Sequence, residues 1–286
     1  MRFEPLSRRR LVVLAYHDIQ DVNTFRSHVD FIRAKLQPVG VDQVIEAQHG
    51  GRPLPPRAVL VTFDDGDRTV YEHALPILFE HDVPAVVFPV TSLIGSQRPF
   101  WFHEARELVR RGVDPGGSVS SSPDDFVRYL KQIRDEERRR LLDELRSASN
   151  EVISQNQLEP HELREMERKG IEIGSHTHTH PCLDQCGENV ILGEVTKAHE
   201  ELTEWLSRSP RVFAYPNGNG DVRAETVLNR LGYDLAFLFD HRIQSLPVAN
   251  PLRISRVRVN STTTMMRFRS IIAGLHPFVH HAVGRS

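Results

Sequence analysis

The chain has 286 residues, of which 39% are hydrophobic and 26% charged, and its formal net charge is −2. This composition is typical of a soluble globular protein and fits one large α/β domain or two small ones. The charge gives no global basic field for nucleic acid, no apolar run reaches transmembrane length, and the two cysteines, Cys182 and Cys186, imply no disulfide framework.

The N-terminal region superficially resembles a signal peptide, because Arg8-Arg9-Arg10 precedes the apolar run of residues 11–15. That run is too short for a leader, and Tyr16-His17-Asp18 ends it without a small-residue cleavage site. We therefore expect residues 11–15 to form the first core strand and the protein to be cytoplasmic.

Short apolar runs alternate with segments of helical periodicity along the rest of the chain. Strands are expected at residues 11–15, 58–61, 84–90, 171–174, 211–215, 235–239 and 254–259. Helices are expected at residues 24–36, 70–81, 99–110, 123–146, 160–169, 187–207, 222–231 and 263–273, with a short edge element at 40–45. Seven strands that alternate with helices predict a parallel α/β fold that is closed or nearly closed.

The segment of residues 95–167 is expected to be an elaborated helical crossover. Ser122 at the N-cap and Pro123 at the first helical position mark a helix start within it. The run Arg138-Arg139-Arg140 lies further along the same helix. We interpret this run as a solvated helix face, in preference to a binding site for an anionic ligand.

Two adjacent aspartates, Asp64 and Asp65, follow the apolar strand of residues 58–61 and precede Gly66. In a βα-repeat architecture, catalytic groups gather at the carboxyl ends of strands. Adjacent carboxylates repel each other, and a divalent metal ion bound to one of them would compensate for the charge while the other accepts a proton from water. The alternative is an ordinary strand followed by an Asp-Asp-Gly turn.

Three histidines, His176, His178 and His180, follow the strand of residues 171–174. Imidazole suits zinc, and a third ligand from a carboxylate leaves an open position for water. The alternative is a histidine-rich surface loop. The combination of two histidines and one aspartate on two strand ends is more specific than either motif alone.

The motifs Thr62-Phe63-Asp64-Asp65-Gly66 and His176-Thr-x-x-His180-Pro181 together resemble those of the polysaccharide deacetylases, also called NodB-homology or carbohydrate esterase family 4 proteins. The resemblance spans nearly the whole chain and implies a single domain, residues 1–286, built as a distorted (β/α) barrel of seven strands. It also implies that Asp64 is the general base. The implied ligands of a divalent metal, with zinc as the first choice and nickel, cobalt, manganese or iron as alternatives, are Asp65, His176 and His180.

Two features depart from the family pattern. The family's third motif usually reads Arg-Pro-Pro-Tyr, and Ala214 stands here in the place of its arginine, which steadies the base. This form resembles a subgroup that includes poly-N-acetylglucosamine and exopolysaccharide deacetylases. Arg256, in the strand of residues 254–259, is the candidate to supply the missing guanidinium, with a surface ion pair as the alternative.

The second departure is the general acid, since the usual histidine near the last strand has no clear counterpart. His276, His280 and His281 lie in a Pro-containing tail with no strand before them. His17, at the end of the first strand, is the better candidate, and its alternative role is that of a hydrogen-bonded core histidine.

The turn after the strand of residues 211–215 is expected to bind the oxyanion or the substrate through Tyr215 and Asn217. Pro216 has no N–H, so the backbone N–H of Asn217 is the preferred oxyanion donor. Trp101, Phe102 and Tyr215 are each candidates to stack on a sugar face or to pack in the core.

The predicted function is therefore metal-dependent removal of N-acetyl groups from a glycan, or a glycan precursor, that contains N-acetylhexosamine. Two alternatives stay open: another C–N hydrolase of the superfamily that acts on a non-sugar amide, and a catalytically silent carbohydrate-binding protein. A glycan is the expected partner, with neither nucleic acid nor an integral membrane segment, and the sequence does not predict the oligomeric state.

Overall fold

The structure is a computed structural model that describes residues 10–114, 122–149 and 151–275. Arg8 and Arg9, on which the leader interpretation depends, lie outside the described residues, as do the three histidines of the C-terminal tail. The cytoplasmic location accordingly stays a prediction. None of the described helices is both long and apolar enough to cross a membrane.

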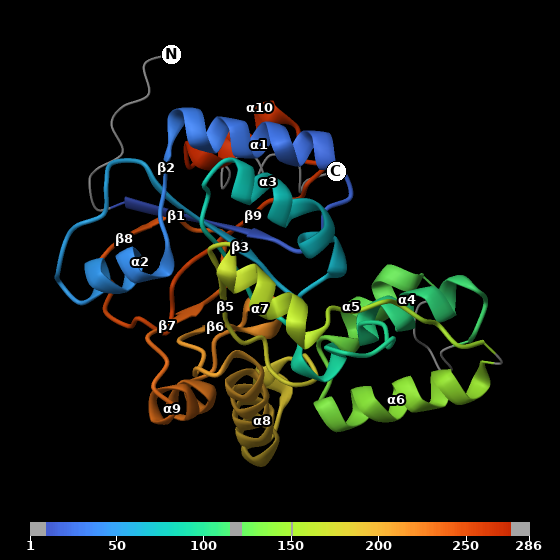
Figure 1. Ribbon diagram of the computed structural model, residues 1–286. Coiled ribbons are helices and arrows are strands. Elements are labelled where there is room, and N and C mark those ends of the chain that lie inside the picture. The colour runs from blue at the N-terminus through green and yellow to red at the C-terminus, as the bar shows by residue number, and fades with distance from the viewer. Residues whose placement is uncertain (1–9, 115–121, 150, 276–286) are drawn as a thin grey trace.

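The strands lie at the centre of the molecule, as Figure 1 shows. Their pairings form a ring around an apolar core. Strands β5, β4, β3 and β1 are adjacent in the sheet, and β9 pairs with the other side of β1. Isolated bridges between Ser175 and Phe213 and between Phe237 and Ile254 connect β5 to β6 and β7 to the segment before β9. The strands are β1 (Arg10–Tyr16), β2 (Gln37–Pro38), β3 (Ala58–Phe63), β4 (Ala85–Val87), β5 (Ile171–Ile173), β6 (Val212–Ala214), β7 (Leu235–Phe237), β8 (Gln244–Ser245) and β9 (Val257–Arg258).

These connections close the circuit and confirm the expected distorted barrel. The distortion lies where strands share an edge. On one side of β3, β2 pairs with its first residues and β4 with its last ones. On one side of β1, the antiparallel β8 pairs with its start and β9 with its end. Neither β2 nor β8 was predicted from the sequence.

Helices surround the ring, and α1 packs against α3 and α10 on one side of it (Figure 1). Helices α4, α5 and α6 lie between β4 and β5 in the chain, stand to one side of the barrel and pack around an apolar cluster of their own. The helices are α1 (Val22–Lys35), α2 (Val41–Gln48), α3 (Leu75–Glu80), α4 (Trp101–Arg110), α5 (Pro123–Leu130), α6 (Asp135–Ala148), α7 (Pro160–Arg168), α8 (Glu188–Leu206), α9 (Val222–Arg230) and α10 (Met265–Ile272).

Strand β1 shows why an unbroken run of apolar residues, without polar alternation, correctly predicts a strand of this barrel. Its residues Val12 and Leu14 belong to the core between sheet and helices, whereas Leu11 and Val13 belong to the core inside the barrel. Because both faces of a barrel strand are buried, each position along it is apolar and no alternation with polar residues is seen.

Three expected elements differ in the structure. Residues 40–45 are not an edge element but the start of α2, because Val41 and Val44 are buried at helical spacing. The predicted helix 123–146 is two helices, α5 and α6. The helix expected at 70–81 begins with a π-helical turn, Val70–Ala74, immediately before Pro76 interrupts the normal hydrogen-bond pattern.

Candidate active site

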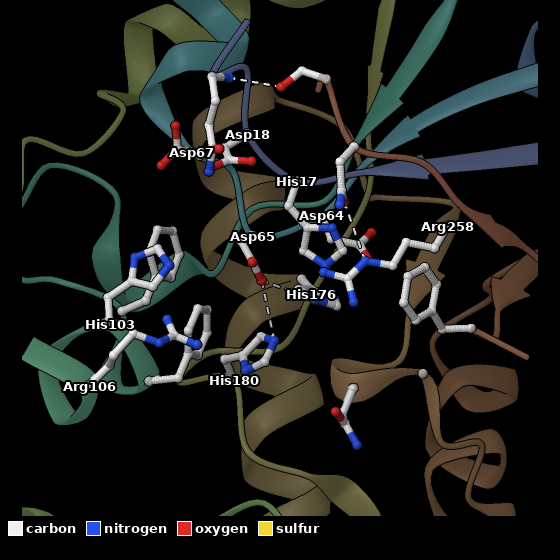
Figure 2. A pocket seen from close by; sticks show the side chains of 18 of the residues that line it. His17, Asp18, Asp64, Asp65, Asp67, His103, Arg106, His176, His180 and Arg258 are labelled. Atoms are coloured by element: carbon white, nitrogen blue, oxygen red, sulfur yellow. Dashed lines mark hydrogen bonds and ion pairs between the residues drawn. The ribbon is translucent and has the colours of Figure 1, made fainter. Parts of the chain in front are cut away.

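A cavity of about 330 Å³ lies where the carboxyl ends of the barrel strands meet (Figure 2). His17 follows β1, the two aspartates follow β3, and His176 and His180 follow β5. Helix α4 closes one side of the cavity with aromatic side chains, including the half-buried Phe102. The topology thus brings residues that are far apart in the sequence into one polar pocket at the rim where barrel enzymes place their catalytic groups.

The turn after β3 directs the two carboxylates. Asp64 continues the sheet, because its N–H donates to Tyr16 O at 2.9 Å. Asp65 has a left-handed backbone with φ 68°, and Gly66 follows with φ 78°. A Cβ atom on Gly66 would lie 2.9 Å from Pro89 Cα, so only glycine fits. Backbone strain of this kind at a non-glycine residue is typical of functional sites.

Asp65, His176 and His180 form a compact group of ligand atoms, all within 4.8 Å of one another. Asp65 Oδ1 lies 3.5 Å from His176 Nε2 and 3.3 Å from His180 Nε2 (Figure 2). His176 Nδ1 lies 2.8 Å from the backbone oxygen of Ala214 and donates to it, which leaves Nε2 free to face the cavity. This orientation by a backbone carbonyl is usual for a metal-bound histidine.

The group has the properties of a metal site. All three side chains are buried, and Asp65 Oδ1 and His180 Nδ1 form no hydrogen bond within the described chain. Burial opposes ionisation of Asp65, but the two imidazoles outweigh it and hold its pKa well below the usual value. Burial lowers the pKa of His180 to about 4. Asp65 and His180 are thus held in the forms that bind a metal ion, a carboxylate and a neutral imidazole. Burial works against a charge on His176, but the carboxylates of Asp64 and Asp65 outweigh it and raise the pKa of His176, and a divalent cation would balance the same negative charge.

Asp64 forms a separate, fully buried ion pair with Arg256. The guanidinium donates to Asp64 Oδ1 at 2.6 Å and to Oδ2 at 2.7 Å, and its Nε donates to Leu238 O at 2.9 Å. Arg256 is 0% exposed, so the alternative of a surface ion pair is wrong. Burial works against the Asp64 carboxylate, but Arg256 and His176 outweigh it and lower its pKa.

His17 lies in the same cavity. The pairing of Tyr16 with Phe63 places His17 beside Asp64 at the rim, and its ring meets that of Phe239 edge-on at 5.8 Å between centroids. Its half-buried side chain lines the pocket and is therefore not a core histidine. Asn217 also lines the cavity, with φ 58°.

Of the three candidates for stacking on a sugar, Tyr215 and Trp101 pack in the core, as the stated alternative had it. The Tyr215 side chain is fully buried and donates its hydroxyl to Leu252 O at 3.1 Å, so it does not reach the cavity. Trp101 is buried beneath the guanidinium of Arg138, 4.5 Å from the ring. Phe102, in contrast, lines the cavity and contacts the His180 ring at 5.3 Å between centroids.

The histidine loop has two anchors that the sequence did not reveal. Glu194 of α8 is buried and accepts hydrogen bonds from Thr179 N at 2.7 Å and from Thr179 Oγ1 at 2.6 Å. Trp101 Nε1 donates to His180 O at 2.9 Å. The loop between the two histidines is thereby held from α8 on one side and from the crossover on the other.

Replacing Glu194 by Ala should weaken zinc binding by about 10- to 100-fold, because the loop that carries His180 loses its anchor. Glu194→Gln should restore most of the affinity, since an amide can both accept from the Thr179 N–H and donate to the hydroxyl. The measurement is a zinc competition titration with a chromophoric chelator. Glu204→Ala, an exposed position on the same helix, is the matched control. Wild-type affinity in Glu194→Ala would show that the loop is held without this contact.

The chain resembles known polysaccharide deacetylases in sequence. A family profile described as polysaccharide deacetylase matches residues 51–236. A poly-beta-1,6-N-acetyl-D-glucosamine N-deacetylase of Escherichia coli (strain K12) is 26% identical over 249 residues, which cover 83% of this chain and 35% of that protein. An enzyme of the same name from Staphylococcus aureus (strain N315) is 23% identical over 216 residues, covering 72% and 56%. The chain thus spans only about a third to a half of the length of these relatives.

Two solved structures share the fold. The Streptococcus pyogenes deacetylase PplD, in complex with acetate, has a TM-score of 0.65 at 18% identity and covers 94% of this chain and 99% of that one. IcaB from Ammonifex degensii has a TM-score of 0.65 at 20% identity, covering 93% and 97%. At these identities the likeness concerns the fold alone.

Proposed function

Because the chain belongs to the polysaccharide deacetylase family, we propose that it is a metal-dependent N-deacetylase that acts on a glycan of the poly-N-acetylglucosamine type. The observation that carries the proposal is the pairing of two separate carboxylates in one cavity. Asp65 lies against two imidazoles as a metal ligand would, while Asp64 is held by Arg256 and is free of that group. Metal-assisted hydrolysis of an amide uses both functions at adjacent positions.

Asp65, His176 and His180 would hold the metal ion, which polarises the acetamido carbonyl and lowers the pKa of water when it is bound. Asp64 takes a proton from the attacking water. Arg256 keeps Asp64 ionised and fixes its orientation through two parallel hydrogen bonds.

Other residues that line the cavity perform the remaining steps. Asn217 lines the cavity, and its backbone N–H would stabilise the negative charge that develops on the carbonyl oxygen. His17 donates a proton to the sugar nitrogen as the C–N bond breaks. The products are acetate and a free amine on the sugar.

The test is acetate release from β-1,6-linked N-acetylglucosamine oligomers by the zinc-loaded protein. We expect release that stops when a chelator removes the metal and resumes when zinc is restored. Release that persists without metal, or from simple non-sugar amides in preference to the oligomers, would favour another amide hydrolase. Oligomer binding without any release would favour the catalytically silent alternative.

His17→Ala should retain metal but lower deacetylation about 10²- to 10⁴-fold, the usual contribution of a general acid. An acetyl ester with a good leaving group needs no protonation and should be much less affected. The measurement is the ratio of kcat/KM on the amide to that on the ester.

His103→Ala removes another histidine that lines the cavity and serves as the control, with an expected ratio equal to that of the wild type. Equal losses of both activities in His17→Ala would instead assign His17 to substrate binding.

A further inference from the structure

Three basic side chains converge on the cavity that holds the metal-ligand group. Arg106 comes from α4, Lys131 directly follows α5, and Arg258 lies in β9. Figure 2 shows Arg106 on the wall opposite Arg258, with the two aspartates and the histidines between them. Separate segments of the chain therefore direct positive charge at one pocket.

Lys131 forms no hydrogen bond or ion pair with any residue in the described ranges. Its side chain is half-buried, and its Nζ lies 5.5 Å from the centroid of the Phe102 ring. Burial lowers the pKa of Lys131, and although Asp65 opposes this, the charges of Arg106 and Arg258 lower it further. The ammonium group of Lys131 is thus partly desolvated and close to the charges of Arg106 and Arg258. This arrangement costs free energy, which an anionic ligand would offset.

Arg258 is similarly without a carboxylate partner among the residues described. Its one hydrogen bond runs from Nε to Asn260 Oδ1 at 3.3 Å. Arg106 differs, because it pairs with the exposed Asp124 at 2.8 Å. Lys131 and Arg258 are therefore the two cations of this cavity that are left for a ligand.

The acidic side chains of the cavity do not neutralise these two cations. Asp67 accepts hydrogen bonds from Thr69 and from Gln155, and Asp18 accepts one from Gln20. Figure 2 shows Asp18 and Asp67 away from Arg258. Asp64 is paired with Arg256, and a divalent ion would more than balance the charge of Asp65.

We propose that the substrate carries an anionic oxygen group, a phosphate ester or a carboxylate, beside the N-acetylhexosamine that loses its acetyl group, and that Lys131 and Arg258 bind it. The inference rests on the proposed deacetylase function and narrows its substrate to a glycan of N-acetylglucosamine that also carries anionic groups, in place of a neutral polymer of N-acetylglucosamine alone. An ammonium group from the end of α5 and a guanidinium group from β9, brought into one cavity, match such a group placed next to the reacting sugar. A neighbouring sugar that is already deacetylated carries an ammonium group and is disfavoured at the same position.

The first test compares acetate release by the zinc-loaded protein from three substrates. They are methyl N-acetylglucosaminide, N-acetylglucosamine 1-phosphate, and a disaccharide of N-acetylglucosamine with glucuronic acid. We expect kcat/KM on at least one of the two anionic substrates to exceed that on the neutral methyl glycoside by about tenfold or more, as for a charge-assisted contact. The anionic substrate with the higher kcat/KM identifies whether the charge comes from a phosphate or from a carboxylate. Lys131→Met and Arg258→Gln should each lower the anionic-to-neutral ratio by a similar factor. Arg128→Gln, an exposed arginine on α5 outside the cavity, should preserve the ratio.

The second test does not depend on turnover. Binding of the same three compounds to the zinc-loaded protein is measured by calorimetry in Asp64→Asn, alone and combined with Lys131→Met or with Arg258→Gln. Since phosphate also binds metal ions directly, the effect of Lys131→Met on the anionic-to-neutral ratio of affinities decides the question. A fall of about tenfold in this affinity ratio supports the proposal whether or not the compounds are hydrolysed. Absence of hydrolysis would count against the deacetylase function alone. Ratios unchanged by Lys131→Met and by Arg258→Gln would overturn it.

Discussion

Asp64→Asn is expected to lower deacetylation by about 10²- to 10⁴-fold while the protein keeps its metal ion. The side-chain amide of the variant cannot take the proton of the attacking water. It is close to the carboxylate in shape, however, and its oxygen still accepts a hydrogen bond from Arg256. Metal binding should be unaffected because Asp64 does not belong to the group formed by Asp65 and the two histidines.

The matched variant is Asp65→Asn, which changes the neighbouring residue in the same turn. It should lose most of its metal, since a neutral amide is a poorer ligand than a carboxylate, and it should lose activity for that reason. The measurements are metal content per chain after dialysis and kcat/KM on the oligomer substrate. If Asp64→Asn lost the metal and Asp65→Asn kept it, the roles of the two residues would be exchanged.

The parts of the fold predicted from sequence are those whose signal is local. The barrel strands are apolar along both faces, so short apolar runs indicated them directly. The metal-ligand group was predicted because its residues stand next to such runs and parallel strands end on one rim. The segment at residues 40–45 is too short for its period to be read, and only burial of Val41 and Val44 on one face identifies the helix.

The missed features depend on contacts between distant residues. A glutamate in an amphipathic helix has the same pattern whether it faces solvent or a loop, so nothing in the sequence distinguished Glu194 from its exposed neighbours. Tyr215 was misread for a related reason. Its position after a strand is that of a rim residue, but its hydroxyl meets Leu252 O from another part of the barrel and holds the ring inside. Arg256 was a candidate for contact with Asp64 on the strength of the resemblance alone, because the contact joins residues 192 positions apart.

Arg256→Met should lower the free energy of unfolding by about 3–5 kcal/mol at neutral pH, because it leaves Asp64 as a buried, unpaired carboxylate. The guanidinium is also enclosed by aromatic rings, with centroids of Phe88, Phe237 and Phe239 at 5.7, 5.9 and 5.7 Å, so water cannot easily take its place. Arg253→Met is the control, since it breaks a more exposed pair with Glu225 and should cost no more than about 1 kcal/mol.

The effect of Arg256→Met on pH dependence follows from the sign of the Asp64 shift. Burial opposes the charge, Arg256 and His176 favour it, and the net result is a pKa below the usual value. A carboxyl of this kind stabilises the fold above its unfolded pKa, and that contribution is lost as the pH falls through the folded pKa. The stability difference between wild type and Arg256→Met should therefore be largest near neutral pH and shrink in acid.

The same substitution should move the acidic limb of the kcat/KM profile to higher pH, because the pKa of Asp64 rises when Arg256 is gone. Arg256→Lys keeps the charge without the two parallel hydrogen bonds and provides a folded variant if the methionine variant is unstable. We expect it to show an acidic limb between those of the wild type and Arg256→Met, together with reduced kcat, since the base is ionised but less well oriented. An acidic limb that stays in place in both variants would mean that the titrating base is not Asp64.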